Sequence, residues 1–132
     1  MSYLEFYTTL TALWVAVSWL PYILDRIATR GLMGALANYD PNAIPQSNWA
    51  QRAMRAHKVN VQAFVAFAPL AIIAMIRIPD DSYPGTLAMT FFFGIVAHYL
   101  IYCSGVIVLR TLAFAVASLS TVALALRLLD II

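Results

Sequence analysis

Long apolar stretches, separated by short polar ones, run through the whole chain. An apolar helix of about 20 residues crosses the hydrocarbon core of a bilayer. We therefore predict four membrane-spanning helices, at about residues 6–27, 48–76, 85–107 and 110–130. The boundary between the last two, near Val108–Arg110, divides an apolar run that is too long for one crossing. Because lipid offers backbone groups no hydrogen bonds, the pattern favours an all-α integral membrane four-helix bundle, a single domain over residues 1–132.

Breaker residues refine this pattern. Pro21 and Pro69 lie inside the first and second apolar segments and predict a kink in each. The longest polar connection, residues 28–47, is rich in Gly, Asn and Pro, and Ser47 or Asn48 at its end is placed to cap the next helix. The first residues lack the basic segment and cleavage site of a signal peptide, so we expect the first helix to be retained.

Composition and charge indicate the class of partner. With 63% hydrophobic and 11% charged residues, the chain is too apolar for an ordinary soluble domain, so membrane lipids are the expected surroundings. A net charge of +2 gives no support for a nucleic-acid partner. Most basic residues fall at the first and third connections: Arg26, Arg30, Arg52, Arg55, Lys58 and Arg110. The positive-inside tendency then places these connections in the cytoplasm and both termini on the non-cytoplasmic side.

The start of the second predicted helix carries a candidate binding face. Residues 52, 55, 59 and 62 recur at i, i+3, i+7 and i+10 and so share one side of a helix, with Lys58 beside them. Cations at the end of a membrane helix need an anion, water or other protein around them. The face is therefore either a pocket for an anionic ligand or a set of basic side chains that reach lipid headgroups.

A second group of polar residues lies on the third apolar segment. His98 and Tyr102 are spaced i, i+4 on one face, which suggests a polar pocket or an interhelical hydrogen bond. Arg110 follows on the same side of the membrane as Arg55 and Lys58. It either completes a cationic site with them or simply marks a cytoplasmic turn.

Other kinds of site find little support. His57 and His98 are the only histidines, and no carboxylate or cysteine accompanies them, so we expect no metal site. A haem- or quinone-binding redox subunit would depend on the same two histidines. Cys103 is the single cysteine, which excludes an internal disulfide. No nucleophile–base pair is evident, and the lack of a carboxylate in mid-membrane argues against a proton-coupled exporter.

Two local motifs resemble those of a known family. The first follows Trp49 and Arg52 and reads Arg55-Ala56-His57; the second reads His98-x3-Tyr102-x2-Gly105-x4-Arg110-Thr111, followed by Phe114. With these motifs, the length and the four expected crossings, the chain resembles the MAPEG superfamily, the membrane-associated proteins in eicosanoid and glutathione metabolism, in a bacterial form.

The resemblance implies a homotrimer with three glutathione sites at its subunit interfaces, on the cytoplasmic side. It assigns thiolate stabilisation to Arg110. The family positions that line or neighbour the peptide site are matched here by Arg55, His98, Tyr102 and Thr111, and we expect Lys58 and Gln62, on the same helix as Arg55, to bind the peptide with them. A hydrophobic second substrate would enter from the bilayer between subunits.

Three positions depart from the family pattern. Val59, Gln62 and Ile95 stand where glutathione-active members usually carry Asn, Glu and Arg. Gln62 can form a hydrogen bond with the peptide's ammonium group but cannot neutralise it. The resemblance implies a glutathione-dependent transferase or peroxidase that acts on lipophilic electrophiles in a bacterial inner membrane. The alternative, which the three departures favour, is a catalytically silent relative that binds a lipid or serves as an accessory subunit of a membrane complex.

Overall fold

The computed structural model describes all 132 residues and contains five helices and no strands. The helices are α1 Tyr3–Val17, α2 Leu20–Leu36, α3 Asn48–Arg77, α4 Tyr83–Ser104 and α5 Ile107–Leu128. Helices α1 and α2 together form one apolar segment, and four segments in all are long and apolar enough to cross a membrane. The prediction of an all-α protein with four such segments is confirmed.

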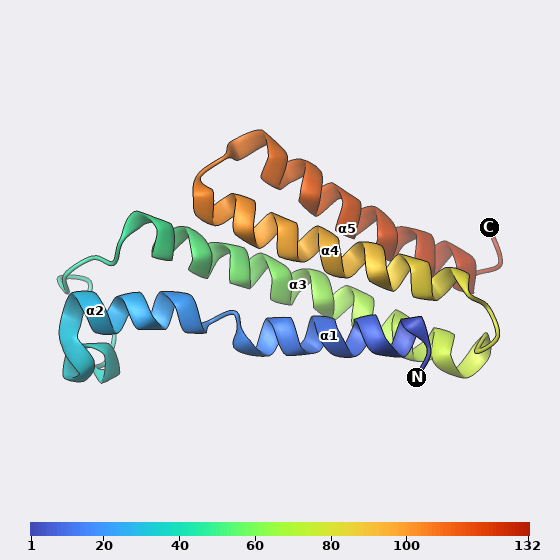
Figure 1. Cartoon of the computed structure of the whole chain (residues 1–132), viewed down its shortest axis with the longest axis horizontal. Helices are drawn as coiled ribbons and strands as arrows, with labels where there is room; N and C mark the ends of the chain where they lie inside the picture. The colour runs from blue at the N-terminus through green and yellow to red at the C-terminus, as the bar shows by residue number, and fades with distance from the viewer.

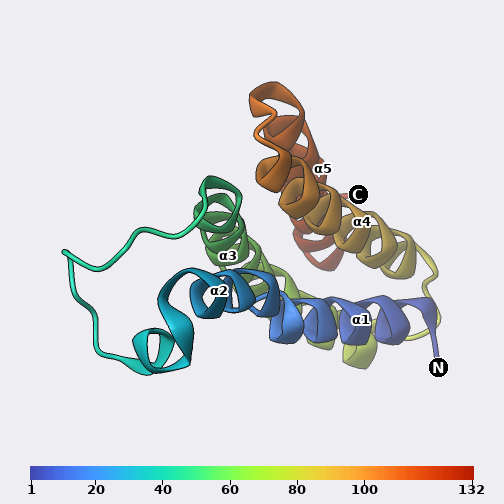
Figure 2. The ribbon, with the colours of Figure 1, turned by 60° about the vertical axis from the view of Figure 1, so that its left-hand side comes forward.

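The long helices lie side by side along one axis (Figure 1). Both termini and the α3–α4 connection are at one end of the bundle, and the α2–α3 and α4–α5 connections are at the other. Helices α3 and α4 are central: α3 contacts all four other helices, and α4 contacts α1, α3 and α5. Figure 2 shows that α5 and the end of α4 diverge from α3 toward the α4–α5 turn.

Helix contacts within the bundle depend on aromatic stacking and on small residues. The rings of Phe67 and Phe91 stack between α3 and α4 with centroids 4.2 Å apart. Between α4 and α5, Gly94 lies so close to Ala117 that a Cβ atom on the glycine would stand 3.1 Å from the alanine nitrogen. Small residues allow this approach of membrane helices, where dispersion contacts drive packing.

The break between α1 and α2 lies before the proline that was expected to cause it. Helix α1 ends at Val17, and Pro21 lies in the first turn of α2, where a missing N–H has no intrahelical partner to lose. The carbonyls at the end of α1 find partners on other helices. Nε2 of His57 donates to Val15 O at 2.9 Å, and the Tyr99 hydroxyl donates to Ser18 O at 2.8 Å.

The boundary between the last two crossings was misplaced. Helix α4 ends at Ser104 and α5 begins at Ile107, earlier than the expected break near Val108–Arg110. The physical cause is Gly105, which adopts a left-handed conformation (φ 86°) that terminates a helix without steric cost. Arg110 therefore belongs to the first turn of α5, directly after the connection.

The first connection is shorter than expected, and α3 continues past Pro69. Helix α2 continues to Leu36, with an interruption at Gly31 (φ 71°), so the connection covers only residues 37–47. Helix α3 runs without interruption from Asn48 through Pro69 to Arg77.

The cap of α3 differs from the sequence expectation in its hydrogen bonds. Ser47 is the cap residue, but its side chain makes no bond to the helix. Its hydroxyl and its N–H instead donate to the Asp25 carboxylate at 2.6 and 3.1 Å, and Gln46 adds a longer bond at 3.4 Å. Asp25 thereby ties α2 to the start of α3.

Candidate functional site

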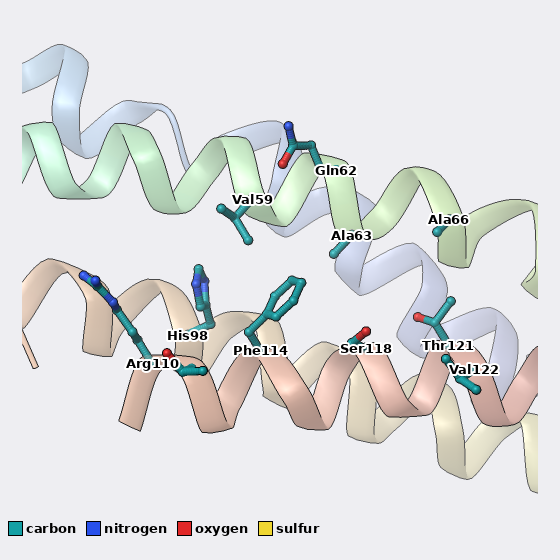
Figure 3. Close-up of a pocket in the computed structure, with 11 residues that line it drawn as sticks. Val59, Gln62, Ala63, Ala66, His98, Arg110, Phe114, Ser118, Thr121 and Val122 are labelled. Carbon is teal, nitrogen blue, oxygen red and sulfur yellow. The ribbon is translucent and has the colours of Figure 1, made fainter. Parts of the chain in front are cut away.

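A pocket of about 620 Å³ opens between α3 and α5, with one residue of α4 at its base. Figure 3 shows its lining residues. They are Val59, Gln62, Ala63, Ala66, His98, Arg110, Thr111, Phe114, Ser118, Thr121 and Val122. Four of the residues proposed from the sequence therefore line one pocket: Gln62, His98, Arg110 and Thr111.

The end of the pocket near the α4–α5 turn is cationic. The His98 side chain is only 4% exposed, and its Nδ1 atom is buried without a hydrogen-bond partner. Arg110 is half-buried and forms no salt bridge, since the only one in the chain joins Arg127 to Asp81. An imidazole nitrogen and a positive charge are thus both left for a ligand to satisfy.

Tyr102 supports this end without lining the pocket. Its ring lies under the Arg110 guanidinium, with 4.3 Å between Cζ and the ring centroid, and its edge meets the His98 ring at 5.6 Å. The other side of the His98 ring faces Phe114 at 5.9 Å. Aromatic contacts of this kind fix the orientation of the two polar side chains.

Away from Arg110 the pocket combines apolar side chains with the hydroxyl groups of Ser118 and Thr121. Phe114, Ser118 and Thr121 follow Arg110 in that order toward the far end (Figure 3). The Thr121 hydroxyl already donates to Ala117 O, which reduces its polarity toward a ligand. The arrangement suits either an amphiphilic ligand or a polar ligand beside an apolar one.

The predicted basic face of α3 is divided. Val59 and Gln62 line the pocket, whereas Arg55 and Lys58 are exposed and lie outside its lining. Nε of Arg52 donates to Cys103 O at 3.1 Å, so this cation stabilises the C-terminal end of α4.

Asn60 cannot replace the asparagine that the family pattern places at residue 59. One residue turns a helix position by 100°. Accordingly Asn60 points into the bundle, where it is 1% exposed and both amide atoms lack partners, while Val59 points from α3 toward His98 (Figure 3).

Comparison with protein families identifies the chain. The sequence pattern of the MAPEG family matches residues 4–130 of the 132. The chain belongs to the MAPEG family. The resemblance inferred from the two motifs is therefore confirmed. No curated protein matches the sequence.

In this MAPEG protein, both ring nitrogens of His57 have hydrogen-bond partners within the fold. The Tyr22 hydroxyl lies 2.8 Å from His57 Nδ1, and Nε2 donates to Val15 O. The ring thus joins α3 to the α1–α2 break. No group of three or more His, Cys, Asp or Glu side chains is arranged to hold a metal ion.

Sequence reasoning missed the apolar half of the pocket in this MAPEG protein. Its members on α5 follow Arg110 at helical spacing, at residues 114, 118, 121 and 122. These positions share one face of a helix. The spacing was available in the sequence, but in a helix that is apolar on every side it does not distinguish a pocket from a lipid-facing surface.

Proposed function

We propose that this MAPEG protein is a glutathione-dependent transferase or peroxidase of a bacterial inner membrane, acting on lipophilic electrophiles. One observation carries the proposal. Arg110 and the buried His98, whose Nδ1 atom has no hydrogen-bond partner, both lie at one end of a pocket that is otherwise largely apolar. Such a pocket offers hydrogen bonds and positive charge to an anionic peptide and an apolar wall to a second substrate.

Arg110 is the group proposed to act on the thiol. A nearby cation favours the thiolate over the thiol and lowers the thiol pKa, and the thiolate is the nucleophile. In the transferase reaction, the thiol proton passes to water and the sulfur forms a bond to the electrophilic carbon. The leaving group departs with the electron pair of the bond that breaks.

The remaining polar residues are proposed to hold the peptide. His98 Nδ1 offers a hydrogen bond from α4, and the Thr111 hydroxyl, which donates to Ile107 O at 3.4 Å, can accept one. The Gln62 amide points away from these two in Figure 3 and would have to turn toward the ligand. Tyr102 keeps Arg110 in place through the contact of its ring. Arg55 and Lys58, exposed on α3, would bind the carboxylates at the mouth of the site.

A homotrimer with the site between subunits is part of the proposal. The exposed position of Arg55 and Lys58 supports it, because a neighbouring subunit would complete the wall that a single chain leaves open. The charge distribution supports an orientation with both termini on the non-cytoplasmic side: six basic residues lie toward the opposite end, while Arg127 at the terminal end is paired with Asp81.

A second function has its own support. No carboxylate lines the pocket, Val59 and Gln62 are uncharged, and Ile95 is 1% exposed in the core. A glutathione ammonium group would find no counter-charge there. This favours a catalytically silent relative that binds a lipid in the pocket or serves as an accessory subunit of a membrane complex.

Calorimetry distinguishes the two functions. Reduced glutathione is titrated into the purified protein in detergent, in parallel with Arg110→Ala and with Arg77→Ala, an exposed arginine outside the pocket lining. The transferase proposal expects micromolar to low-millimolar binding that weakens roughly tenfold or more in Arg110→Ala only. Absence of binding to folded wild-type protein would overturn the proposal and favour the lipid-binding alternative.

A further inference from the structure

The end of α2 and the connection after it expose an unusual number of apolar side chains. Beyond Gly31 these side chains are between 59% and 89% exposed: Leu32, Met33, Leu36, Tyr39 and Ile44. None of them takes part in the hydrophobic core. Large apolar side chains gathered in this way mark a surface that another phase or molecule covers.

The direction of this segment is also distinctive. At Gly31 the backbone takes a positive φ, and α2 then turns across the long axis of the bundle (Figure 1). Figure 2 shows the following connection extending sideways from the helices before it returns to α3. Nε of Arg30 donates to Ile44 O at 2.6 Å and closes the segment onto α2. If the four apolar segments cross a bilayer along the long axis of the bundle, a segment that turns across this axis at their end would lie along the membrane surface.

Charge indicates which surface it meets. The basic residues toward this end of the bundle are Arg26, Arg30, Arg52, Arg55, Lys58 and Arg110, and none forms a salt bridge. The two carboxylates of this region are engaged in hydrogen bonds, Asp25 with Ser47 and Asp40 with the Asn42 N–H. Unpaired cations beside exposed apolar and aromatic side chains are typical of a segment that binds anionic headgroups.

We propose that residues 31–44 form an interfacial anchor. Their apolar side chains insert at the boundary between headgroups and acyl chains, and Arg30 binds the phosphates of anionic lipids. This inference rests on the exposed apolar side chains of the α2–α3 region and on Arg30, and it does not depend on what the pocket binds.

Site-directed fluorescence tests the anchor in the full-length protein. In a Cys103→Ser background, single cysteines are introduced by Met33→Cys and, as a matched control, by Asn42→Cys, a polar exposed position of the same connection. Each is labelled with a fluorophore and reconstituted in nanodiscs of phosphatidylcholine with or without phosphatidylglycerol. Quenching by brominated acyl chains reports lipid contact, and quenching by iodide reports water.

The anchor predicts opposite results at the two positions. The label at residue 33 should be quenched by brominated lipid and shielded from iodide, and the label at residue 42 should behave conversely. Lipid quenching at residue 33 should increase severalfold with phosphatidylglycerol. That increase should persist in Arg30→Lys and be clearly smaller in Arg30→Gln, in which the other basic residues of this end remain.

Three outcomes would overturn the proposal. Equal access of iodide to both labels would place the segment in water. Shielding at residue 33 without lipid quenching would indicate that a second copy of the chain covers it. Lipid quenching that is equal with and without phosphatidylglycerol would show that Arg30 does not bind anionic lipid.

Discussion

The guanidinium carbon of Arg110 lies 4.3 Å from the centre of the Tyr102 ring, so an aromatic side chain of α4 holds the cation of α5 at the pocket. The same ring meets His98 edge-on. His98, Tyr102 and Arg110 lie within twelve positions of one another in the sequence. Their side chains are in contact across the α4–α5 turn through the Tyr102 ring. Their mutual arrangement depends on the early turn at Gly105, which brings Arg110 back beside Tyr102.

Two substitutions of Tyr102 distinguish the contribution of its aromatic ring from that of its hydroxyl. A cation–π contact contributes roughly 0.5–2 kcal/mol. Tyr102→Leu should therefore weaken glutathione binding about two- to thirtyfold, whereas Tyr102→Phe should retain most of the affinity. Calorimetry on the two variants measures the difference. Equal losses in both would assign the effect to the hydroxyl and contradict the stacking role.

Loss of His57 should destabilise the α1–α2 break. In His57→Ala, Val15 O and the Tyr22 hydroxyl both lose their partner, and an unsatisfied buried group costs about 1–3 kcal/mol. We expect the free energy of unfolding to fall by roughly 2–3 kcal/mol in detergent titrations followed by circular dichroism. Tyr22→Phe removes only one of the two bonds and should cost about 1 kcal/mol. A variant as stable as the wild type would show that water replaces the ring.

The sequence was sufficient for the crossings because their apolar lengths leave few alternatives. It was not sufficient to place the residues at which the helices end. Gly105 was available as a helix terminator, but the apolar residues after it favoured a later boundary. The break before Pro21 depends on carbonyl partners from α3 and α4, which are distant in sequence and so cannot be inferred from local pattern.

The site was predictable only in part for a similar reason. Charge and spacing singled out His98 and Arg110, and the structure places both in one pocket. The same reasoning assigned Arg55 and Lys58 to the site. The basic face of α3 is broad, however, so that one part of it lines the pocket while Arg55 and Lys58 lie on the exposed surface of the chain. Whether a neighbouring subunit covers that exterior is a property of the assembly, which no local pattern encodes.

Close contact between α4 and α5 should make Gly94 intolerant of large side chains. A Cβ atom there would stand 3.1 Å from Ala117 and 3.3 Å from Ala113 O. Gly94→Leu should lower the free energy of unfolding by roughly 1–3 kcal/mol through overpacking. Leu100→Met, at an exposed position of the same helix, should change it by less than about 0.5 kcal/mol. Detergent titration of both variants checks the contrast; similar effects would contradict it.

Acid should weaken the connection between α3 and α4. The hydrogen bond from Arg127 at 2.7 Å, aided by the Tyr83 N–H, holds the pKa of Asp81 below its ordinary value of 3.8. Because the folded state lowers this pKa, the carboxylate stabilises the fold above pH 3.8, and that contribution is lost as the pH falls through the lowered value.

Thermal unfolding between pH 7 and pH 3 measures this loss. Asp81→Asn should reduce the melting temperature at neutral pH and flatten its decline in acid. Asp80→Asn, which removes a neighbouring carboxylate without a hydrogen bond to Arg127, should leave the decline intact. A decline of equal steepness in Asp81→Asn would assign the acid sensitivity to another group.

Gln62→Glu is expected to add the counter-charge that the pocket lacks. Gln62 is exposed in the single chain, so a new pair with the glutathione ammonium should resemble a surface ion pair and raise affinity roughly two- to fivefold. Gln62→Met, similar in size and uncharged, should give no increase. A gain of tenfold or more would mean that the pair is desolvated, as a site covered by a neighbouring subunit requires. An unchanged affinity would mean that no ammonium group approaches residue 62, and it would shift the balance toward a lipid as the occupant of the pocket.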